Sequence, residues 1–536
     1  MMLGKFNSEK KFIDQIKKSK YVIIYGAGMV GELIYNRILR YGLDKKVIGF
    51  AVTQKQENKE EKEVACLQDA FPCRVCKVPI SEIRDLGKYK KDAVVIIATL
   101  PDLHKEIGQS LSNLDFQNVV FISSGLYQNI CQNYISDFKK QHIFSFEENA
   151  KMKILFMASD NSHVSGAFRC MAELCGLLRE RGVAAAVILP HYGSGAGLLT
   201  QKKIPYTYIE SKDWGYELEK AHNLLEKLKF FIALQQNHKA KRELIQLIRT
   251  YSVSLVHCNT TYTYIGAKAA KACGVPYVWH LRENMENQGY RIFAKKKAMR
   301  LLQGSAQVIA VSQYIKSLRL FKGWEAIQVV YDAVEKDGAS VGSREIFESK
   351  TIRMVIVGAI TPFKGQKELI KACGILLKRN MTNFCLQIVG KGERSFLEEL
   401  QKEIERYHLE EKVVFTGTSS NVYELYEKSD IAFTCGAKEA YGRVTIEALL
   451  SGCFVIGIRA GATPELIQEG KTGLLYEAGN PEELAEKIIQ AAESPELSRR
   501  IAKAGQEYAN RTYLKENNVR EIMDIYEKVL ERKRSS

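Results

Sequence analysis

Residues 431–450 read IAFTCGAKEAYGRVTIEALL, which joins a short apolar run, a polar loop and a helical pattern. The apolar run 431–434 is typical of a buried parallel strand, and the last residues of the stretch predict a helix. Gly442 lies at the turn between them, where the missing side chain lets a ligand approach the backbone closely. Because the first N–H groups of a helix favour an anion, the loop predicts a diphosphate site above a sheet.

Two carboxylates flank this turn. Glu439 falls in the loop, and Glu447 lies about one turn inside the predicted helix. Carboxylates are poor phosphate ligands, but they accept hydrogen bonds from the hydroxyl groups of a sugar or a ribose. Glutamate is also common on solvated helix faces, so the spacing alone leaves that alternative open.

The two glutamates around a glycine resemble the donor-site signature of glycosyltransferase family 4, whose members are retaining enzymes with the GT-B fold. The resemblance implies that Glu439 contacts the transferred sugar and that Glu447 contacts the ribose of the nucleotide. It also implies an α/β architecture of two Rossmann-like lobes that face a cleft, with the nucleotide sugar held mainly by the C-terminal lobe. The residues between the glutamates that it assigns to donor binding are Ala440, Tyr441, Gly442 and Arg443.

Further motifs of the resemblance occur earlier in the C-terminal part of the chain. Lys364 matches a lysine that clamps the diphosphate in the family, whereas Ala359 replaces the arginine expected after Gly358. Arg443 could supply the missing cation, or it could be a surface arginine. Two later strand-and-glycine turns are expected around the donor, and their glycines are Gly390 and Gly417.

The middle of the chain begins a second α/β pattern. Gly166 keeps the position of a glycine turn that faces the donor in the family, and Ser165 stands where a second glycine is common. His280 ends a predicted buried strand, and ligands of such sheets bind beyond the carboxyl ends of the strands. Family members carry a histidine at this strand end, so the resemblance implies that His280 contacts the transferred sugar or the acceptor. A structural histidine is the alternative.

The first part of the chain contains a third glycine turn, G-x-G-x-x-G, formed by Gly26, Gly28 and Gly31. It lies between a strand and a helix, which is the context of the dinucleotide fingerprint. The acid that binds a ribose is absent after the second strand, where Thr53 stands, and this argues against NAD. The arrangement resembles the small Rossmann-like domain of bacterial sugar O-acyltransferases, and a nucleotide site there stays an alternative to a purely structural role.

These patterns predict five segments and a polar hinge at residues 335–350. The segments are a Rossmann-like accessory domain at 1–130, a linker at 131–151, an acceptor lobe at 152–336, a donor lobe at 351–510, and a C-terminal helix at 511–536 that returns to the acceptor lobe.

The composition is that of a globular protein, with 46% hydrophobic and 26% charged residues among 536. No run approaches the roughly 18 apolar residues of a spanning helix, and the first residues lack the apolar core of a signal peptide, so we expect a cytoplasmic protein.

Twelve cysteines are scattered along the chain. Cys73 and Cys76 form a single C-x-x-C, for which reduced thiols are favoured over a metal site. No Asp-x-Asp motif occurs, and we expect neither a metal nor another cofactor.

The net charge of +16 favours anionic partners. Residues 287–324 contain eight Lys and Arg side chains and no acid. Within them, 291–302 predicts a helix whose apolar residues are interleaved with basic ones. Because each basic side chain near an anionic leaflet contributes about 1 kcal/mol, residues 291–322 predict contact with an anionic membrane surface. Nucleic acid is not favoured, since no aromatic stacking platform accompanies the charge.

The sequence therefore predicts a retaining glycosyltransferase of the hexosyltransferase type. Its donor would be a nucleotide-diphosphate sugar, and its acceptor a glycan or lipid-linked glycan of bacterial surface polysaccharide biosynthesis. Two alternatives remain: a scaffold that binds a nucleotide sugar without catalysis, and an NAD-dependent oxidoreductase that uses the N-terminal turn. The sequence does not identify the sugar, the base or the acceptor.

Overall fold

The computed structural model describes residues 4–535 except 54–59, 67–73, 100–102, 148–149, 220–222, 287–288, 322, 335–345 and 420. Cys73 of the C-x-x-C pair, Lys322 of the basic stretch and most of the predicted hinge therefore lie outside the described residues. The chain divides into two compact units. The first comprises residues up to Gly176 with Val183–Lys212 and Gln236–Tyr251; the second comprises Leu177–Gly182, Asp213–Gln235 and Ser252–Ser536.

The first unit opens with a seven-stranded sheet of order β1-β7-β6-β2-β3-β5-β4. All neighbouring strands are parallel except β4 and β5. The strands are β1 Gly4–Phe6, β2 Tyr21–Tyr25, β3 Val47–Val52, β4 Glu61–Cys66, β5 Arg74–Glu82, β6 Ala93–Ile97 and β7 Asn118–Ile122. The helices are α1 Glu9–Lys18, α2 Met29–Arg40, α3 His104–Asn113 and α4 Ser124–Gln141.

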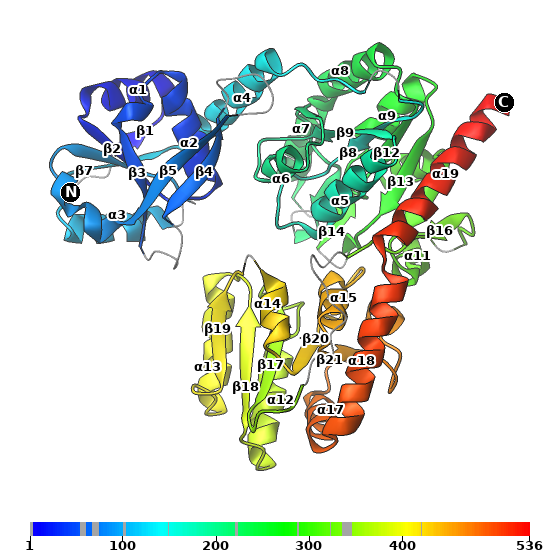
Figure 1. Cartoon of the computed structure of the whole chain (residues 1–536). Coiled ribbons are helices and arrows are strands. Elements are labelled where there is room, and N and C mark those ends of the chain that lie inside the picture. Colours follow the sequence, from blue (N-terminus) through cyan, green and yellow to red (C-terminus); the bar gives the residue numbers. More distant parts are fainter. Residues whose placement is uncertain are drawn as a thin grey trace. The chain divides into compact units, whose positions relative to one another are not determined.

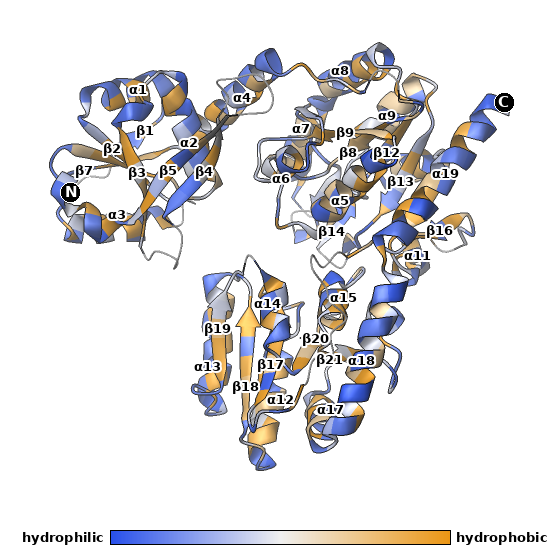
Figure 2. Ribbon diagram, viewed as in Figure 1, coloured by the Kyte–Doolittle hydropathy of each residue, from blue (hydrophilic) through white to orange (hydrophobic). Residues whose placement is uncertain are grey.

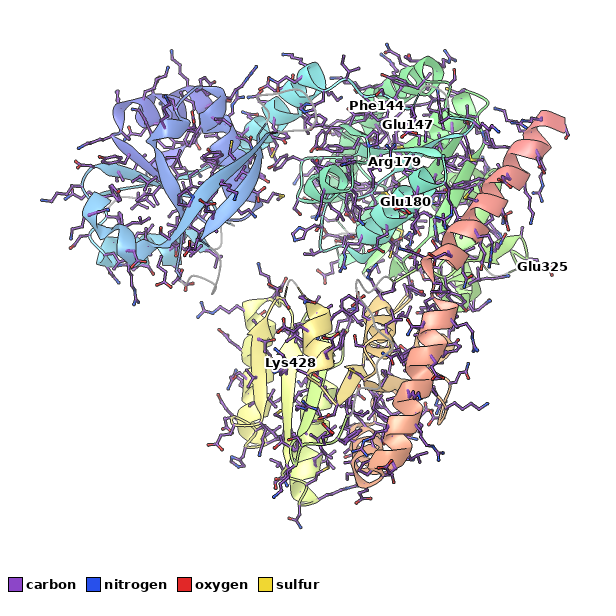
Figure 3. All side chains as sticks on the ribbon, viewed as in Figure 1. Phe144, Glu147, Arg179, Glu180, Glu325 and Lys428 are labelled. Carbon is purple, nitrogen blue, oxygen red and sulfur yellow. The ribbon has the colours of Figure 1, made fainter. Side chains whose placement is uncertain are left out.

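The predicted linker at 131–151 is wrong over its first half, because residues 131–141 continue helix α4. Ile135 and Phe138 are buried on one face of this helix, and the Phe138 ring stacks on Tyr206 with centroids 5.1 Å apart. The following segment is also held: the carbonyl of Phe144, labelled in Figure 3, accepts a hydrogen bond from the Tyr251 hydroxyl. Apolar residues at helical spacing thus outweigh the polar composition that suggested a linker.

The same unit also contains the parallel strands β10-β9-β8. They are β8 Lys153–Met157, β9 Ala184–Leu189 and β10 Tyr206–Tyr208. The helices of this region are α5 Gly166–Glu180, α6 Gly195–Gln201 and α8 Asn237–Thr250. Every residue of β9 is buried, as expected for a parallel strand covered on both faces.

The second unit begins with four parallel strands in the order β12-β13-β15-β16 and an antiparallel pair of β11 and β14. The strands are β11 Gly215–Glu217, β12 Leu255–Cys258, β13 Tyr277–Leu281, β14 Tyr290–Ile292, β15 Gln307–Ala310 and β16 Ile327–Val329. The helices are α7 Leu224–Gln235, α9 Ile265–Ala272, α10 Lys295–Gln303 and α11 Gln313–Ser317. The helix predicted at 291–302 is therefore wrong at its start, where β14 pairs with β11.

The C-terminal sheet of the second unit has six parallel strands in the order β19-β18-β17-β20-β21-β22 (Figure 1). They are β17 Ile352–Val357, β18 Phe384–Val389, β19 Val413–Gly417, β20 Ile431–Thr434, β21 Phe454–Ile458 and β22 Leu474–Tyr476. The helices are α12 Gln366–Lys378, α13 Arg394–Arg406, α14 Val422–Glu427, α15 Arg443–Leu450, α16 Thr463–Leu466, α17 Pro481–Glu493 and α18 Pro495–Thr512. Figure 2 shows the apolar character of the central strands, whose side chains form one buried cluster with α12 and α17.

The chain ends in helix α19, Lys515–Ser535. Its Tyr526 is fully buried, and the Tyr526 hydroxyl lies 2.6 Å from Nδ1 of His257 in β12. The last helix thus packs on the strands of the middle region inside the second unit. Among the described residues, no helix is both long and apolar enough to cross a membrane.

Candidate functional site

The order of the C-terminal sheet places a switch point between β17 and β20. From β17 the chain moves to β18 on one side and later to β20 on the other, so the loops after β17 and β20 diverge at the same sheet edge. Ligands of open parallel sheets bind at such a point, beyond the carboxyl ends of the strands. The two loops are in close contact, since a Cβ on Gly365 would lie 2.3 Å from the carbonyl oxygen of Cys435.

An ion pair joins these loops. The ammonium group of Lys364, from the loop before α12, contacts Oε1 of Glu439, from the loop before α15. Glu439 is 13% exposed and Lys364 is 38% exposed, so a ligand can reach both from solvent. The structure therefore brings together two residues that the sequence assigned to the donor, although 75 positions separate them.

The backbone of Glu439 is fixed from a third loop. The N–H of Ala462 donates to the carbonyl oxygen of Glu439 at 3.0 Å. A Cβ on Gly461 would lie 2.7 Å from the same carbonyl oxygen. The approach of the loop after β21 thus holds the Glu439 backbone in place at the sheet edge.

Helix α15 begins at the predicted turn. Gly442 is its N-cap with φ +92°, a left-handed conformation that favours glycine, and no side chain caps the helix. Arg443 Nε donates to Oε1 of Glu447 at 2.9 Å, and the two side chains are only 12% and 4% exposed. Arg443 is therefore no free surface arginine; it neutralises a buried carboxylate one turn further along.

Three glycine turns lie together at the ends of β17, β18 and β19. The N–H of Gly390 donates to the carbonyl oxygen of Gly417 at 2.8 Å. A Cβ on Gly390 would lie 1.8 Å from the carbonyl oxygen of Gly358. The three predicted glycine turns therefore lie next to one another, beside the switch point.

Ala359 stands at the position of the expected arginine. Its carbonyl oxygen accepts a hydrogen bond from Gln366 Nε2 at 3.0 Å.

Ala440 and Tyr441 connect the donor loop to the middle strands of the same unit. The Ser312 hydroxyl donates to the carbonyl oxygen of Ala440 at 2.6 Å. The Tyr441 hydroxyl donates to the carbonyl oxygen of Asp332, and the Tyr441 ring stacks on Tyr331 with centroids 6.2 Å apart. Both residues therefore have structural contacts in addition to their predicted place beside the donor.

His280 is fully buried, and its contact with the transferred sugar or the acceptor stays a prediction beside the structural alternative. It lies within β13 rather than beyond it, and its Nδ1 is 3.2 Å from Nη2 of Arg282. Burial, with the nearby Arg282 and His257, lowers the pKa of His280 well below its usual value. The side chain is therefore a neutral imidazole in the interior of the second unit at neutral pH.

Sequence reasoning missed the buried ion pair beside it. The guanidinium of Arg282 contacts the carboxylate of Asp332, and Arg282 Nε donates to the side-chain oxygen of Asn259 at 3.1 Å. Arg282 follows β13 and Asp332 follows β16, two strands of one sheet. Opposite charges at the ends of two strands of one sheet are a signal that could have found this pair.

Glu465 is a second residue that the sequence did not single out. Its two carboxylate oxygens accept the N–H groups of Gln313 at 2.8 Å and Tyr314 at 2.6 Å. Oε2 of Glu465 also accepts a hydrogen bond from the Tyr331 hydroxyl at 3.0 Å. Glu465 thus joins α16 of the C-terminal sheet to α11, and no local pattern distinguishes it from an ordinary first-turn glutamate.

The remaining predicted residues belong to the first unit. Gly166 begins α5, and a Cβ added there would meet no other atom within 4 Å. In the N-terminal turn, a Cβ on Gly31 would lie 2.1 Å from the carbonyl oxygen of Gly26, so this glycine is needed for packing of the turn on α2. Gly28 is the N-cap of α2. The Thr53 hydroxyl, at the place of the expected acid, is bonded to the Tyr25 hydroxyl.

Comparison with known families identifies the class of protein. Residues 164–337 match the family described as Glycosyltransferase Family 4, and residues 343–508 match the family described as Glycosyl transferases group 1. Solved glycosyltransferases share the fold. A glycosyltransferase from Rickettsia africae gives a TM-score of 0.58 at 22% identity, over 71% of this chain and 99% of that one. The chain is therefore a glycosyltransferase with the GT-B fold.

Individual relatives agree with this class. The chain is 36% identical to N-acetyl-alpha-D-glucosaminyl L-malate synthase of Bacillus anthracis over 27% of its own length and 38% of that protein's length. It is 24% identical to an uncharacterized glycosyltransferase of Methanocaldococcus jannaschii over 60% of its length and 89% of the relative. The Anabaena HepE protein in complex with UDP and glucose gives a TM-score of 0.55 at 24% identity, over 70% of this chain and 98% of HepE.

Proposed function

We propose that the chain transfers a hexose from a nucleotide-diphosphate sugar to a glycan or lipid-linked glycan with retention of configuration. The observation that carries this proposal is the ion pair of Lys364 and Glu439 at the switch point of the C-terminal sheet. A cation and a carboxylate placed together suit a ligand that has a diphosphate at one end and sugar hydroxyls at the other.

Each residue has a chemical role in this proposal. As the bond from sugar to diphosphate breaks, negative charge develops on the phosphate oxygens. Lys364 and the N–H groups that begin α15 stabilise that charge without a metal or another cofactor. Glu439 accepts hydrogen bonds from the transferred sugar, and Glu447 accepts from the ribose beside its partner Arg443. The acceptor hydroxyl attacks from the side of the leaving group, which takes up the proton.

Similar proteins support the proposed donor class and the proposed role in polysaccharide synthesis. The HepE structures contain UDP and UDP-glucose, which favours a uridine nucleotide among the donors. WaaG, similar in fold with a TM-score of 0.51, is described as a glycosyltransferase involved in lipopolysaccharide biosynthesis. A role in bacterial surface polysaccharide synthesis is therefore part of the proposal.

The test is a donor screen followed by analysis of the product. A nucleotide that binds only the folded chain raises the melting temperature, so UDP, GDP and ADP are compared first, each with its hexose derivatives. The anomeric configuration of the product is then read by NMR. Inversion would refute retention. Donor binding without transfer to any glycan would favour the scaffold alternative, and a shift with NAD alone would revive the oxidoreductase.

We also propose that the enzyme works at the cytoplasmic face of an anionic membrane, with residues 291–322 facing it. The exposed cations of α10, Lys295, Lys296 and Lys297, support this contact. The apolar residues of α10 do not contribute, since Ala298, Leu301 and Leu302 are buried in the protein core. Sedimentation with anionic and neutral vesicles at low and high salt tests the proposal. Equal binding to both vesicle types would contradict it.

A further inference from the structure

A cavity of about 600 Å³ lies in the second unit, beyond the carboxyl ends of β12 and β13. Its lining comes from segments far apart in sequence. They include Thr261 after β12, Glu283 after β13, and Lys227 on α7. Part of the lining, including Arg291 and Lys295, belongs to the basic stretch 291–322. The volume of the cavity falls in the range of pockets that hold small ligands.

One wall carries a polar group that lacks a partner. Thr261 is 1% exposed, and within the described part of the chain its hydroxyl oxygen has no hydrogen-bond partner. Its backbone N–H donates to Oε2 of Glu283 at 3.2 Å. A buried hydroxyl without a partner is costly, and native structures rarely keep one unless a ligand or water uses it. The cavity is therefore suited to a ligand with a polar group near Thr261.

The rest of the lining divides into an apolar body and a cationic rim. The apolar side chains are Tyr216, Met285, Ile292, Phe293, Leu318, Leu320 and Phe321, and the cations are Lys227, Arg291 and Lys295. The acids Glu283 and Glu286 also contribute, and Glu283 is already engaged by Thr261. Such a lining matches an amphiphile that has an anionic head and an apolar chain.

Helix α7 continues the apolar surface outside the cavity. Its inner face is held by Phe230, whose ring lies 5.3 Å from that of Phe293 and 5.0 Å from that of Tyr216. The outer face carries large apolar side chains that are 50–78% exposed: Leu224, Leu225, Leu228, Phe231 and Ile232. An exposed apolar patch of this kind marks an interaction site. Beside lysines, it fits the interface of an anionic bilayer.

We propose that this cavity binds the phosphate-bearing head of a membrane lipid, while the outer face of α7 enters the bilayer that supplies it. The inference rests on the proposed function and adds that the glycan acceptor is carried on a lipid phosphate. A chain of hydrogen bonds links the cavity to the donor side. Asn284 in the lining donates to the Tyr314 hydroxyl at 3.3 Å, and the Tyr314 N–H donates to Glu465 of α16.

The head site is tested on the full chain with dihexanoyl phosphatidic acid as a soluble lipid phosphate, measured by calorimetry. We expect saturable binding, with no binding of inorganic phosphate or dihexanoyl phosphatidylcholine at the same concentrations. Thr261→Val keeps the shape but removes the hydroxyl, and it should weaken binding about tenfold without lowering the melting temperature. Lys227→Gln should also weaken binding. Its matched control is Lys229→Gln on the same helix, where Lys229 pairs with Glu226 outside the lining.

The bilayer contact is tested by flotation with phosphatidic acid vesicles. Leu225→Ser combined with Ile232→Ser should abolish flotation, whereas Leu514→Ser, which changes an exposed leucine of the C-terminal region, should not. Binding of inorganic phosphate as tight as the lipid phosphate would overturn the proposal, as would full lipid affinity in Thr261→Val and Lys227→Gln. UDP binding is measured on the same variants. Loss of lipid binding with unchanged UDP binding concerns the cavity alone, whereas loss of UDP binding concerns the proposed donor site.

Discussion

Glu439 and Glu447 each form an ion pair with a basic side chain, and the two pairs differ in their exposure to solvent. The pair of Glu439 with Lys364 is partly exposed, whereas the pair of Glu447 with Arg443 is almost entirely enclosed. An exposed pair contributes little to stability, but a buried carboxylate that loses its partner is strongly destabilising. The first pair is therefore available for ligand chemistry, and the second maintains the helix that follows the turn.

For Glu439→Gln we expect a loss of transfer with little change in stability. The amide keeps the size of the side chain but removes the charge that faces the sugar and Lys364. The loss of one charged hydrogen bond, about 1.5–3 kcal/mol, lowers kcat/KM by roughly ten- to a hundredfold. Transfer kinetics and the UDP-induced thermal shift are measured together. Wild-type kcat/KM in this variant would remove Glu439 from the site, and Glu399→Gln on the distant α13 serves as the control.

Arg443→Met should destabilise the C-terminal sheet and weaken nucleotide binding. The change leaves the buried Glu447 carboxylate without its cation, at a cost of about 3 kcal/mol. Arg394→Met is the matched control, because Arg394 pairs with Glu398 at the same spacing on an exposed helix face, where about 0.5 kcal/mol is expected. Chemical denaturation compares the two. Equal losses would show that burial of the Glu447 pair has no energetic consequence.

Single residues of the candidate site could be predicted where a local pattern surrounds them. Glu439 and Glu447 stand out through the strand, the glycine turn and the helix around them. The pair of Arg282 and Asp332 lacks such a local pattern, because 50 positions separate the two residues. Its signal is the pair of opposite charges after two strands of one sheet, and it can be used only once the sheet is known. For His280 the strand-end position did not indicate the burial of the side chain, which depends on the elements packed around β13.

At the scale of elements, the strands with continuous apolar runs and the glycine turns followed from the sequence, whereas short edge strands such as β4 and β14 and two helical segments did not. The buried strands are continuous apolar runs, which few other structures produce. The second half of α4, residues 131–141, is predicted as a linker because polar residues separate its buried positions. Before α10, Arg291 and Ile292 pair with β11 instead of forming a helix. Pairing with a distant strand overrides local helical propensity there.

Gly390→Ala should disrupt the C-terminal sheet. Gly390 has φ +151°, and an added Cβ would lie 1.8 Å from the backbone oxygen of Gly358. Strain of this kind costs about 1–3 kcal/mol, and the clash adds to it. Gly417→Ala is the control, since Gly417 also has positive φ but open space, and about 1–2 kcal/mol is expected. Equal urea midpoints for the two variants would contradict the role of the close approach.

At the scale of the whole molecule, buried histidines couple stability to pH. Burial, together with Arg282, lowers the folded-state pKa of His257 and of His280 from the usual 6.5. The unfolded chain therefore takes up protons first on acidification. The stability that these groups contribute is complete above about pH 6.5 and is lost as the pH falls below that value.

The wild-type melting temperature should therefore fall between pH 7.5 and pH 5.5, and His280→Asn should reduce this fall. Each unit of pKa difference corresponds to about 1.4 kcal/mol. His238→Asn, which replaces an exposed histidine of α8, is measured alongside as the surface control. A variant at position 280 with the full wild-type pH dependence would show that this histidine does not titrate in the unfolding equilibrium.

The hydrogen bonds from Ser312 to Ala440 and from Gln313 and Tyr314 to Glu465 have a kinetic consequence. The first attaches α11 to the loop that carries Glu439, and the other two attach it to α16. Occupancy by the nucleotide sugar and the position of α11 therefore depend on each other. We expect a compulsory order in which the donor binds first and the nucleoside diphosphate leaves last. Product inhibition tests this order: the nucleoside diphosphate should compete with the donor and be noncompetitive towards the acceptor. Ser312→Ala, which cuts one of these attachments, should move the mechanism towards random addition.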